Sequence, residues 1–257
     1  KSMTQWVRFN HGDAVQFGTL DGETINIHGG FMFEGASSTG ETVALVEVEL
    51  LTPCVPSKIV ALWNNSQSAA EKQGLKTPED PLFFIKGANT FLASGGIIQK
   101  PNSYDGRVIY EAELGIVIGK TCKEVSEADT QSYIFGFTCV NDVTALQLLD
   151  KDPSFPQWAR AKGFDTFGAF GPAIVADVDI SGSSIRAELN GRERQNYPVS
   201  DLMMQPAELV HRISQDMTLF AGDIISCGTG PGALPMKPGA QIDVIIDGVG
   251  TLTNTYE

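Results

Sequence analysis

The chain has 257 residues, of which 42% are hydrophobic and 19% charged, and its formal net charge at pH 7 is -13. This length allows one sizeable core with a small appendage, and the composition excludes the disordered and membrane-embedded classes. The acidic balance argues against nucleic acid and against an anionic membrane surface as partners, because both are bound through clustered Lys and Arg.

Residues 4–50 are predicted to form short strands joined by tight turns. Residues 6–30 alternate apolar and polar side chains, and the segments 11–13 (HGD) and 20–22 (LDG) have the composition of turns. Pro53 and Pro56 then bracket a short connection. We therefore expect a small β-rich N-terminal domain over residues 1–53 and a main domain over residues 54–257.

The main domain is predicted to be mixed β with few and short helices. Because its strands do not alternate with long helices, a doubly wound parallel sheet is not expected. Apolar strands are predicted over residues 58–63, 81–86, 108–118 and 133–140, with a final strand pair over 239–249. Short helices are predicted over residues 66–74, 126–133 and 206–215.

Cysteine usage indicates a reducing compartment. The four cysteines stand singly in apolar surroundings and form no C-x-x-C pair, so we expect buried free thiols. With only three histidines, a zinc site built on paired histidines is not expected. No apolar run reaches transmembrane length and no signal peptide opens the chain, which predicts a cytoplasmic location.

Two glutamates stand two positions apart within the apolar segment 109–118 (IYEAELGIVI). A strand places Glu111 and Glu113 on the same face. Carboxylates held that close raise each other's pKa unless a cation lies between them. Two interpretations stay open here: a metal-binding pair, or two solvated glutamates on an exposed edge.

Asp142 follows the apolar run 133–140 and offers a third carboxylate at the end of a buried strand. It could ligate a metal, or it could cap a helix that begins at residues 143–146 (VTAL). Three carboxylates with no nearby His or Cys select a hard cation such as Mg²⁺, Mn²⁺ or Ca²⁺.

Five motifs together resemble the fumarylacetoacetate hydrolase superfamily over roughly residues 55–257. They occur in that family's order and spacing, at 110–120 (YEAELGIVIGK), 141–145 (NDVTA), 158–172 (WARAKGFDTFGAFGP), 190–195 (NGRERQ) and 221–232 (AGDIISCGTGPG). The resemblance implies a β-roll core, a homodimer and a small 2-oxo acid as substrate. It also implies one Mg²⁺ or Mn²⁺ per chain, held by Glu111, Glu113 and Asp142.

The same resemblance assigns substrate contacts. It implies that Lys162 binds the oxo or carboxylate oxygens and acts in catalysis, as a point charge near a developing enolate. Thr229 would offer its hydroxyl and its backbone N–H to the substrate carboxylate, with Gly228 beside it. Gln195 and Asp165 match the family pattern as further substrate-site residues, with Asp165 behind the direct contacts.

The chain departs from the hydrolytic members, which carry a His-x-x-Glu dyad on the short helix after the first main-domain strand. The histidine position falls on Ser68, or on Gln67 with a shift of one residue, while Glu71 remains. Neither Ser nor Gln accepts a proton at neutral pH, so hydrolysis of a C–C bond is in doubt. Glu71 is expected to act as the base if burial raises its pKa; otherwise it is an ordinary surface glutamate.

Two further departures concern the substrate. The family's F-x-K-P is F-I-K-G at residues 84–87, and an Arg common after the metal-binding Asp is Leu146 here, which indicates a different substrate tail. Residues 62–65 (LWNN) resemble the branch that contains 2-hydroxyhepta-2,4-diene-1,7-dioate isomerase and 5-carboxymethyl-2-oxo-hex-3-ene-1,7-dioate decarboxylase.

The expected function is therefore metal-dependent chemistry on a small 2-oxo or 2-hydroxydienoic acid through a stabilised enolate. An isomerase, decarboxylase or hydratase of aromatic-compound catabolism is the leading interpretation. An acylpyruvate-type C–C hydrolase and a non-catalytic protein that binds 2-oxo acids are the alternatives.

Overall fold

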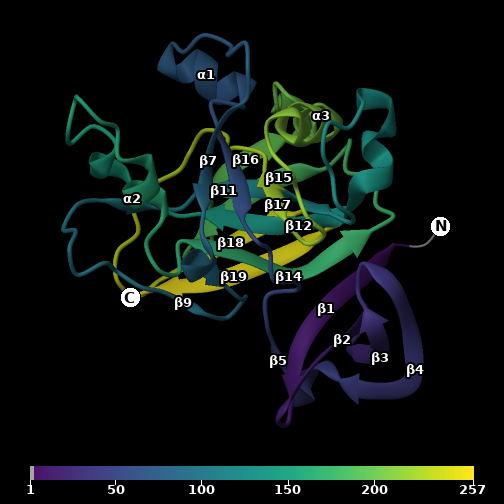
Figure 1. The fold of residues 1–257 in the computed structure, drawn as a ribbon. Helices are drawn as coiled ribbons and strands as arrows, with labels where there is room; N and C mark the ends of the chain where they lie inside the picture. The colour runs from purple at the N-terminus through teal and green to yellow at the C-terminus, as the bar shows by residue number, and fades with distance from the viewer. Residues whose placement is uncertain (1–2) are drawn as a thin grey trace.

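The computed structural model describes residues 3–257, and strands dominate the fold (Figure 1). A mixed 12-stranded sheet runs through the whole molecule. In spatial order its main path is β4 (Glu34–Ala44), β3 (Thr24–Phe31), β2 (Ala14–Asp21), β1 (Thr4–His11), β14 (Gly168–Ala176), β12 (Ile134–Asp142), β11 (Ala112–Ile118), β17 (Ile224–Ser226), β6 (Ile59–Trp63) and β7 (Leu82–Lys86). The short strands β5 (Glu49–Leu50) and β8 (Phe91–Leu92) pair with β1 and β14.

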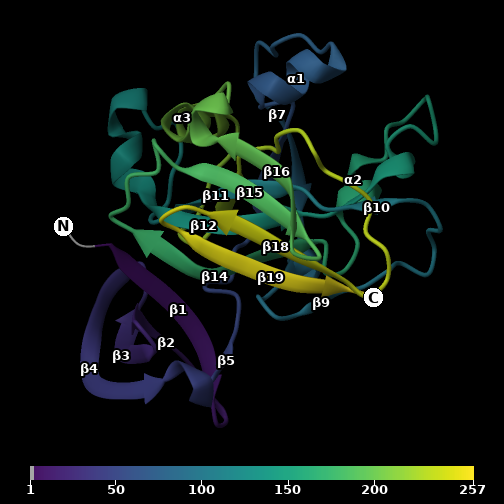
Figure 2. The same cartoon turned by 180° about the vertical axis from the view of Figure 1, so that it is seen from behind.

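A second sheet covers the middle of the first (Figure 2). Its strands are, in order, β16 (Arg192–Pro198), β15 (Ser184–Leu189), β18 (Ala240–Ile246), β19 (Gly250–Tyr256) and β9 (Ile97–Ile98). β15, β18 and β19 pack against β11, β12 and β14, and the largest buried cluster lies between these layers. Since both faces of β11 are covered, all seven of its residues are buried. The predicted mixed β class is confirmed.

The N-terminal strands β1 to β4 stand to one side of the main body (Figures 1 and 2). Gly12 and Gly22 lie in the two predicted turns with φ near +60°, a conformation that glycine adopts at little cost. These strands have their own small apolar cluster, yet β1 pairs with β14 and continues the long sheet. The predicted short strands over residues 4–50 are confirmed, while the division after residue 53 stays a prediction.

Three α-helices form among the described residues: α1 (Gln67–Gln73), α2 (Trp158–Lys162) and α3 (Pro206–Asp216). α1 begins where the Ser66 side chain accepts from the Ala69 N–H, and it ends at Gly74 in the left-handed conformation, as predicted. α3 starts at a proline, as predicted, whereas α2 was not predicted. None of the helices over residues 3–257 has the length and apolar character that crossing a bilayer requires.

The predicted helix over residues 126–133 is a 3₁₀ helix, η3 (Glu127–Tyr133). The remaining 3₁₀ helices of the described chain are η1 (Leu45–Glu47), η2 (Ala88–Thr90), η4 (Leu146–Leu148) and η5 (Val199–Asp201).

The predicted continuous strand over residues 108–118 is wrong in one respect. It breaks into β10 (Val108–Ile109) and β11, and β10 pairs separately with β13 (Thr144–Ala145). Glu111 lies in the gap, because its backbone N–H bonds the Asn141 side chain and its carbonyl accepts from the Asp142 N–H. A helix does not follow Asp142 directly, so that residue is not a helix cap: β13 comes next, and then η4.

Candidate active site

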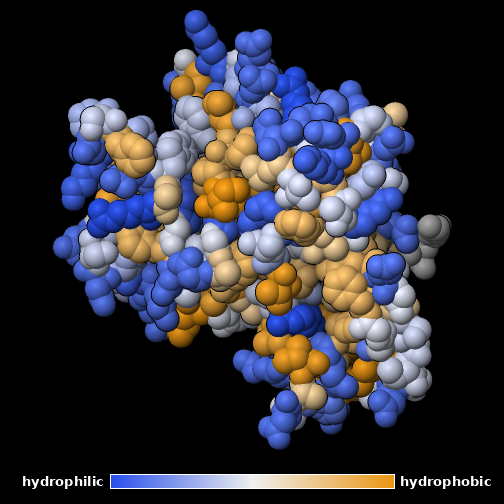
Figure 3. All heavy atoms as spheres, in the orientation of Figure 1, coloured by the Kyte–Doolittle hydropathy of each residue, from blue (hydrophilic) through white to orange (hydrophobic). Residues whose placement is uncertain are grey.

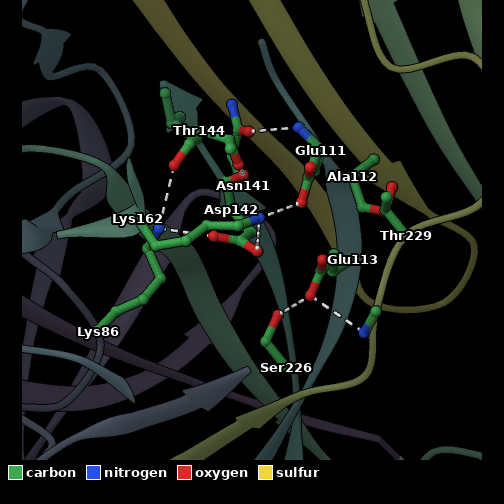
Figure 4. A network of polar contacts seen from close by, with 12 residues as sticks. Lys86, Glu111, Ala112, Glu113, Asn141, Asp142, Thr144, Lys162, Ser226 and Thr229 are labelled. Carbon is green, nitrogen blue, oxygen red and sulfur yellow. Dashed lines mark hydrogen bonds and ion pairs between the residues drawn. The ribbon is translucent and has the colours of Figure 1, made fainter. Parts of the chain in front are cut away.

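The three predicted carboxylates come together at one end of β11 and β12 (Figure 4). Each of Glu111, Glu113 and Asp142 offers an oxygen, and these oxygens all lie within 4.8 Å of one another. The antiparallel pairing of Glu113 with Val140 brings the two strands into this register. Glu113 is fully buried and the Glu111 side chain is only 13% exposed, so the alternative of two solvated glutamates on an exposed edge does not hold. Asp142 is fully buried as well.

Glu113 carries an oxygen without a partner. Its Oε2 accepts a short hydrogen bond from the Ser226 hydroxyl and another from the Gly228 N–H at 3.1 Å. Its Oε1 is buried and has no hydrogen-bond partner among the described residues. Burial, and after it the charges of Asp142 and Glu111, raise the pKa of Glu113 well above its usual value. A buried carboxylate oxygen left in this state suits a cation, and oxygen ligands alone suit Mg²⁺ or Mn²⁺.

Asp142 is held between two lysines. Lys86 donates to Oδ1 at 2.6 Å, and Lys162 donates to Oδ2 at 2.7 Å. Burial alone would raise the pKa of Asp142, but the two ammonium charges outweigh it and lower that pKa. Asp142 is therefore ionised and fixed in orientation.

Lys162, the last residue of α2, also contacts Glu111, with Nζ 2.8 Å from Oε2. Burial would lower the pKa of Lys162, but the charges of Asp142, Glu111 and Glu113 raise it above its usual value. For Glu111 itself, burial raises the pKa to about 7, against the opposing charge of Lys162. Lys162 is thus a fixed positive charge beside the carboxylates.

A cavity of about 440 Å³ opens in front of this cluster. Glu111, Lys162 and Thr229 line it, whereas Glu113 and Asp142 lie behind them. Its other walls come from the end of β6, from α1, from η4 and from the loop of residues 229–233. A small ligand in the cavity would therefore meet Glu111 and Lys162 at its floor.

Of the predicted substrate-binding residues, some line the cavity and others hold the lining residues in place. The Gln195 Oε1 accepts from the Ala112 N–H at 3.0 Å, and its Nε2 donates to the Thr229 Oγ1 at 2.8 Å. The Thr229 hydroxyl donates to the Ala112 carbonyl at 3.1 Å. Gln195 thus orients Thr229, and the N–H of Gly228 is taken by Glu113.

Asp165 does not join this group. It is exposed, its Oδ1 accepts from the Asn89 side chain at 2.8 Å, and it does not line the cavity. It follows Lys162 closely in the chain, but the turn after α2 directs it elsewhere.

Glu71 does not meet the condition set for a base. It is exposed, accepts from Gln67 Nε2 at 3.1 Å and is absent from the cavity wall. Ser68, at the position of the missing histidine, donates to Asp201 through its N–H at 3.0 Å and its hydroxyl at 2.9 Å. The α1 dyad of the hydrolases therefore has no equivalent in this geometry.

Sequence reasoning missed three residues that support the site: Lys86, Ser226 and Asp201. Lys86 follows Phe84 by two positions, so strand periodicity could have placed it on the buried face. Ser226 and Asp201 reach their partners across 113 and 133 positions of sequence, respectively, and no local pattern announces such contacts.

Comparisons with known proteins agree on one family. Residues 58–257 match the family model "Fumarylacetoacetate (FAA) hydrolase C-terminal", and residues 4–53 match "Rv2993c-like, N-terminal". The structure of 2-hydroxyhepta-2,4-diene-1,7-dioate isomerase from Mycobacterium marinum superposes with a TM-score of 0.90 at 35% identity and 98% coverage of both chains.

Two further proteins are similar over most of the chain. Oxaloacetate tautomerase YisK of Bacillus subtilis is 35% identical over 82% of this chain and 74% of its own length. Fumarylpyruvate hydrolase from Pseudomonas aeruginosa, solved in complex with Mn²⁺ and pyruvate, has a TM-score of 0.72 at 25% identity, covering 77% of this chain and 88% of that one. With the family model matching most of its residues, the chain belongs to the fumarylacetoacetate hydrolase family.

Proposed function

We propose that the chain is an enzyme that binds one Mg²⁺ or Mn²⁺ through Glu111, Glu113 and Asp142 and acts on a small 2-oxo or 2-hydroxydienoic acid. Isomerisation of the tautomerase type, or decarboxylation, is the reaction that we favour over hydration. The observation that carries the proposal is the buried, partnerless Oε1 of Glu113 in a cluster of three carboxylates behind the cavity floor. The names of the similar isomerase and tautomerase support the reaction class.

When bound, the cation supplies Lewis-acid polarisation of the substrate's 1-carboxylate and 2-oxo oxygens, which favours the enolate. Lys162 adds a fixed positive charge at the same floor, since Glu111 and Asp142 hold its ammonium group. The hydroxyl proton of Thr229 is engaged by Ala112, so we assign the backbone N–H of Thr229 as the donor to the substrate carboxylate. That N–H has no hydrogen-bond acceptor among residues 3–257.

The absence of a base beside the cavity argues against the hydrolase alternative. Glu111 is the single acid, and no histidine stands, among the described residues that line the cavity. Hydrolysis needs an activated water, whereas loss of CO₂ from a 3-carboxylated 2-oxo acid needs only stabilisation of the resulting enolate. Tautomerisation of an enol releases its hydroxyl proton to solvent and takes a proton at C3 from water, so both transfers can proceed through solvent.

The test is turnover of the enol of a small 2-oxo acid and of a conjugated 2-hydroxydienoate, followed by ultraviolet absorbance. Chelator-treated protein should be inactive, and added Mn²⁺ or Mg²⁺ should restore activity. Lys162→Met should lower the rate about 100-fold or more. The exposed Lys120→Met serves as the matched control and should leave the rate unchanged. Metal-dependent binding of oxalate without turnover of any such acid would instead establish the non-catalytic alternative.

We also propose a homodimer. β7 is an edge strand of the long sheet, and Leu82 and Ile85 on it are exposed. Apolar side chains gather over this strand and below it on the face in Figure 3. An exposed apolar edge strand is a surface that a partner commonly covers. Light scattering on the purified protein should give twice the chain mass, and a monomer would contradict the assignment.

A cytoplasmic location is part of the same proposal. Its support is the state of the four cysteines, all buried free thiols, which suits a reducing compartment.

A further inference from the structure

We infer that the cavity selects a 2-oxo acid with an uncharged, apolar tail, and that Leu146 is a determinant of this choice. The inference rests on the proposed function, because it takes the carboxylates and Lys162 as the site of the 2-oxo acid head.

The residues that would contact the 2-oxo acid head and some of those that would contact its tail lie on or beside the same short ladder. β10 pairs with β13 through Val108 and Ala145, and the Leu146 N–H donates to the Arg107 carbonyl at 3.0 Å. The ladder pairs Ile109 with Thr144 and brings Leu146 opposite Arg107. Ile109, two positions before Glu111, and Leu146 both line the cavity. A ligand whose head meets Glu111 therefore extends along Ile109, Leu146 and Leu149, which line the same cavity.

Another part of the cavity wall is aromatic. Trp158 stacks on Phe84 with ring centroids 5.4 Å apart and makes an edge contact with Trp63 at 5.8 Å. Trp63 and Trp158 line the cavity. Packed aromatic rings keep the shape of an apolar wall and offer no carboxylate partner on their faces.

Of the described residues that line the cavity, two are cations: Lys162, which carboxylates hold, and Lys72, which is exposed to solvent. Lys72 lies in the last turn of α1. A second carboxylate placed against Leu146 and Leu149 would lose part of its hydration against apolar side chains, and solvated Lys72 would compensate only weakly, which is costly. Apolar substituents gain from the same wall.

The experiment measures binding by calorimetry with Mn²⁺ present, using two acids of matched shape. 5-Methyl-2-oxohexanoate and 2-oxoglutarate differ in a terminal isopropyl group against a terminal carboxylate. We expect the first to bind at least ten-fold more tightly. Lengthening the tail from pyruvate to 2-oxobutanoate to 2-oxopentanoate should tighten binding about four-fold per methylene, the factor equivalent to about 0.8 kcal/mol.

Variants locate the preference. Leu146→Arg should reverse it in favour of 2-oxoglutarate, whereas Leu146→Met, which keeps an apolar side chain of similar volume, should keep it. Lys72→Met should leave the ratio of the two affinities within two-fold of the parent protein. Tighter binding of 2-oxoglutarate than of 5-methyl-2-oxohexanoate by the parent protein would overturn the inference. A preference that is lost in Lys72→Met but kept in Leu146→Arg would overturn it as well.

Binding of pyruvate distinguishes a failure of the tail inference from a failure of the proposed function. If pyruvate binds in a metal-dependent way and the tails do not discriminate, the tail inference fails and the proposed function stands. If no 2-oxo acid binds with Mn²⁺ or Mg²⁺, both fail.

Discussion

Lys86 Nζ lies 2.6 Å from Asp142 Oδ1, and neither side chain is exposed to solvent. With Lys162 on the other oxygen, Asp142 is fixed from both sides before any cation arrives. With all three carboxylates ionised, as cation binding requires, the two ammonium groups leave the cluster with one net negative charge. The site thus attracts a divalent cation while its fixed positive charges limit the repulsion of an anionic substrate.

Lys86→Met should destabilise the metal-free protein by about 3–5 kcal/mol, since Asp142 keeps its charge and loses a buried partner. Mn²⁺ should recover part of this loss, because the cation supplies the missing positive charge. Chemical denaturation with and without Mn²⁺ measures both effects. The exposed Lys120→Met should cost less than about 1 kcal/mol. Equal costs for the two variants would show that Lys86 does not stabilise Asp142.

Glu113→Gln should change stability and metal binding in opposite directions. Burial, and after it the charges of Asp142 and Glu111, disfavour the ionised carboxylate, and the neutral amide avoids this cost. The metal-free protein should therefore melt at a higher temperature. Metal affinity should fall by more than the roughly 10–100-fold that loss of an outer-shell partner costs, because a direct ligand is removed. Calorimetric titration with Mn²⁺ measures this loss.

A matched control for Glu113→Gln is the exposed Glu79→Gln, which should alter neither quantity. An unchanged Mn²⁺ affinity in Glu113→Gln would remove Glu113 from the ligand set.

Much of the fold could be predicted because its signals are local. Ser66 and Gly74 mark the two ends of α1 by side-chain capping and by a left-handed residue, and both features depend on the residue itself. Gly12 and Gly22 mark two turns for the same kind of reason. The break at Glu111 could not be read this way, since a side chain 30 positions away, Asn141, takes its backbone N–H.

In the candidate site too, the features with a local sequence signal could be predicted and the contacts between distant residues could not. The i, i+2 spacing of Glu111 and Glu113 is a local signal, and the two carboxylates do lie together. Glu71 and Asp165 were assigned by sequence position, and the backbone carries both to the surface. The support of Glu113 by Ser226 depends on the pairing of β11 with β17, which no spacing in the sequence encodes.

The pKa of Glu111 predicts a pH-dependent effect of metal. Burial raises this pKa to about 7, from a value near 4.3 in the unfolded chain. Between these pH values the folded metal-free protein holds more protons than the unfolded one, so its stability falls as pH rises from about 4.5 to 7. A cation needs the ionised carboxylate, so the melting shift produced by Mn²⁺ should grow over the same interval.

Thermal unfolding from pH 5 to pH 8, with and without Mn²⁺, checks this dependence. The pKa of Asp142 is lowered, so its contribution changes only below about pH 4 and leaves this window clear. Glu111→Gln should reduce the slope of the metal-free profile, and the raised pKa of Glu113 accounts for the slope that remains. A Mn²⁺ shift that is constant across the window would contradict the assignment of Glu111 as a ligand that must lose its proton.

Ser68→His tests whether the missing base alone separates this chain from a hydrolase. Asp201 already accepts both the N–H and the hydroxyl of Ser68, so an imidazole at this position would have a carboxylate to orient it and raise its pKa. A positioned general base contributes about 10²–10⁴-fold, and acylpyruvate hydrolysis should rise within that range. Ser68→Ala, which removes the hydroxyl without supplying a base, should leave hydrolysis at the parent level.

Hydrolysis by the parent protein as fast as by Ser68→His would mean that a water held by other residues already suffices. No gain in Ser68→His, with Mn²⁺ binding intact, would mean instead that α1 holds position 68 at the wrong distance from the substrate, so that the position of the helix as well as the identity of one residue sets the reaction.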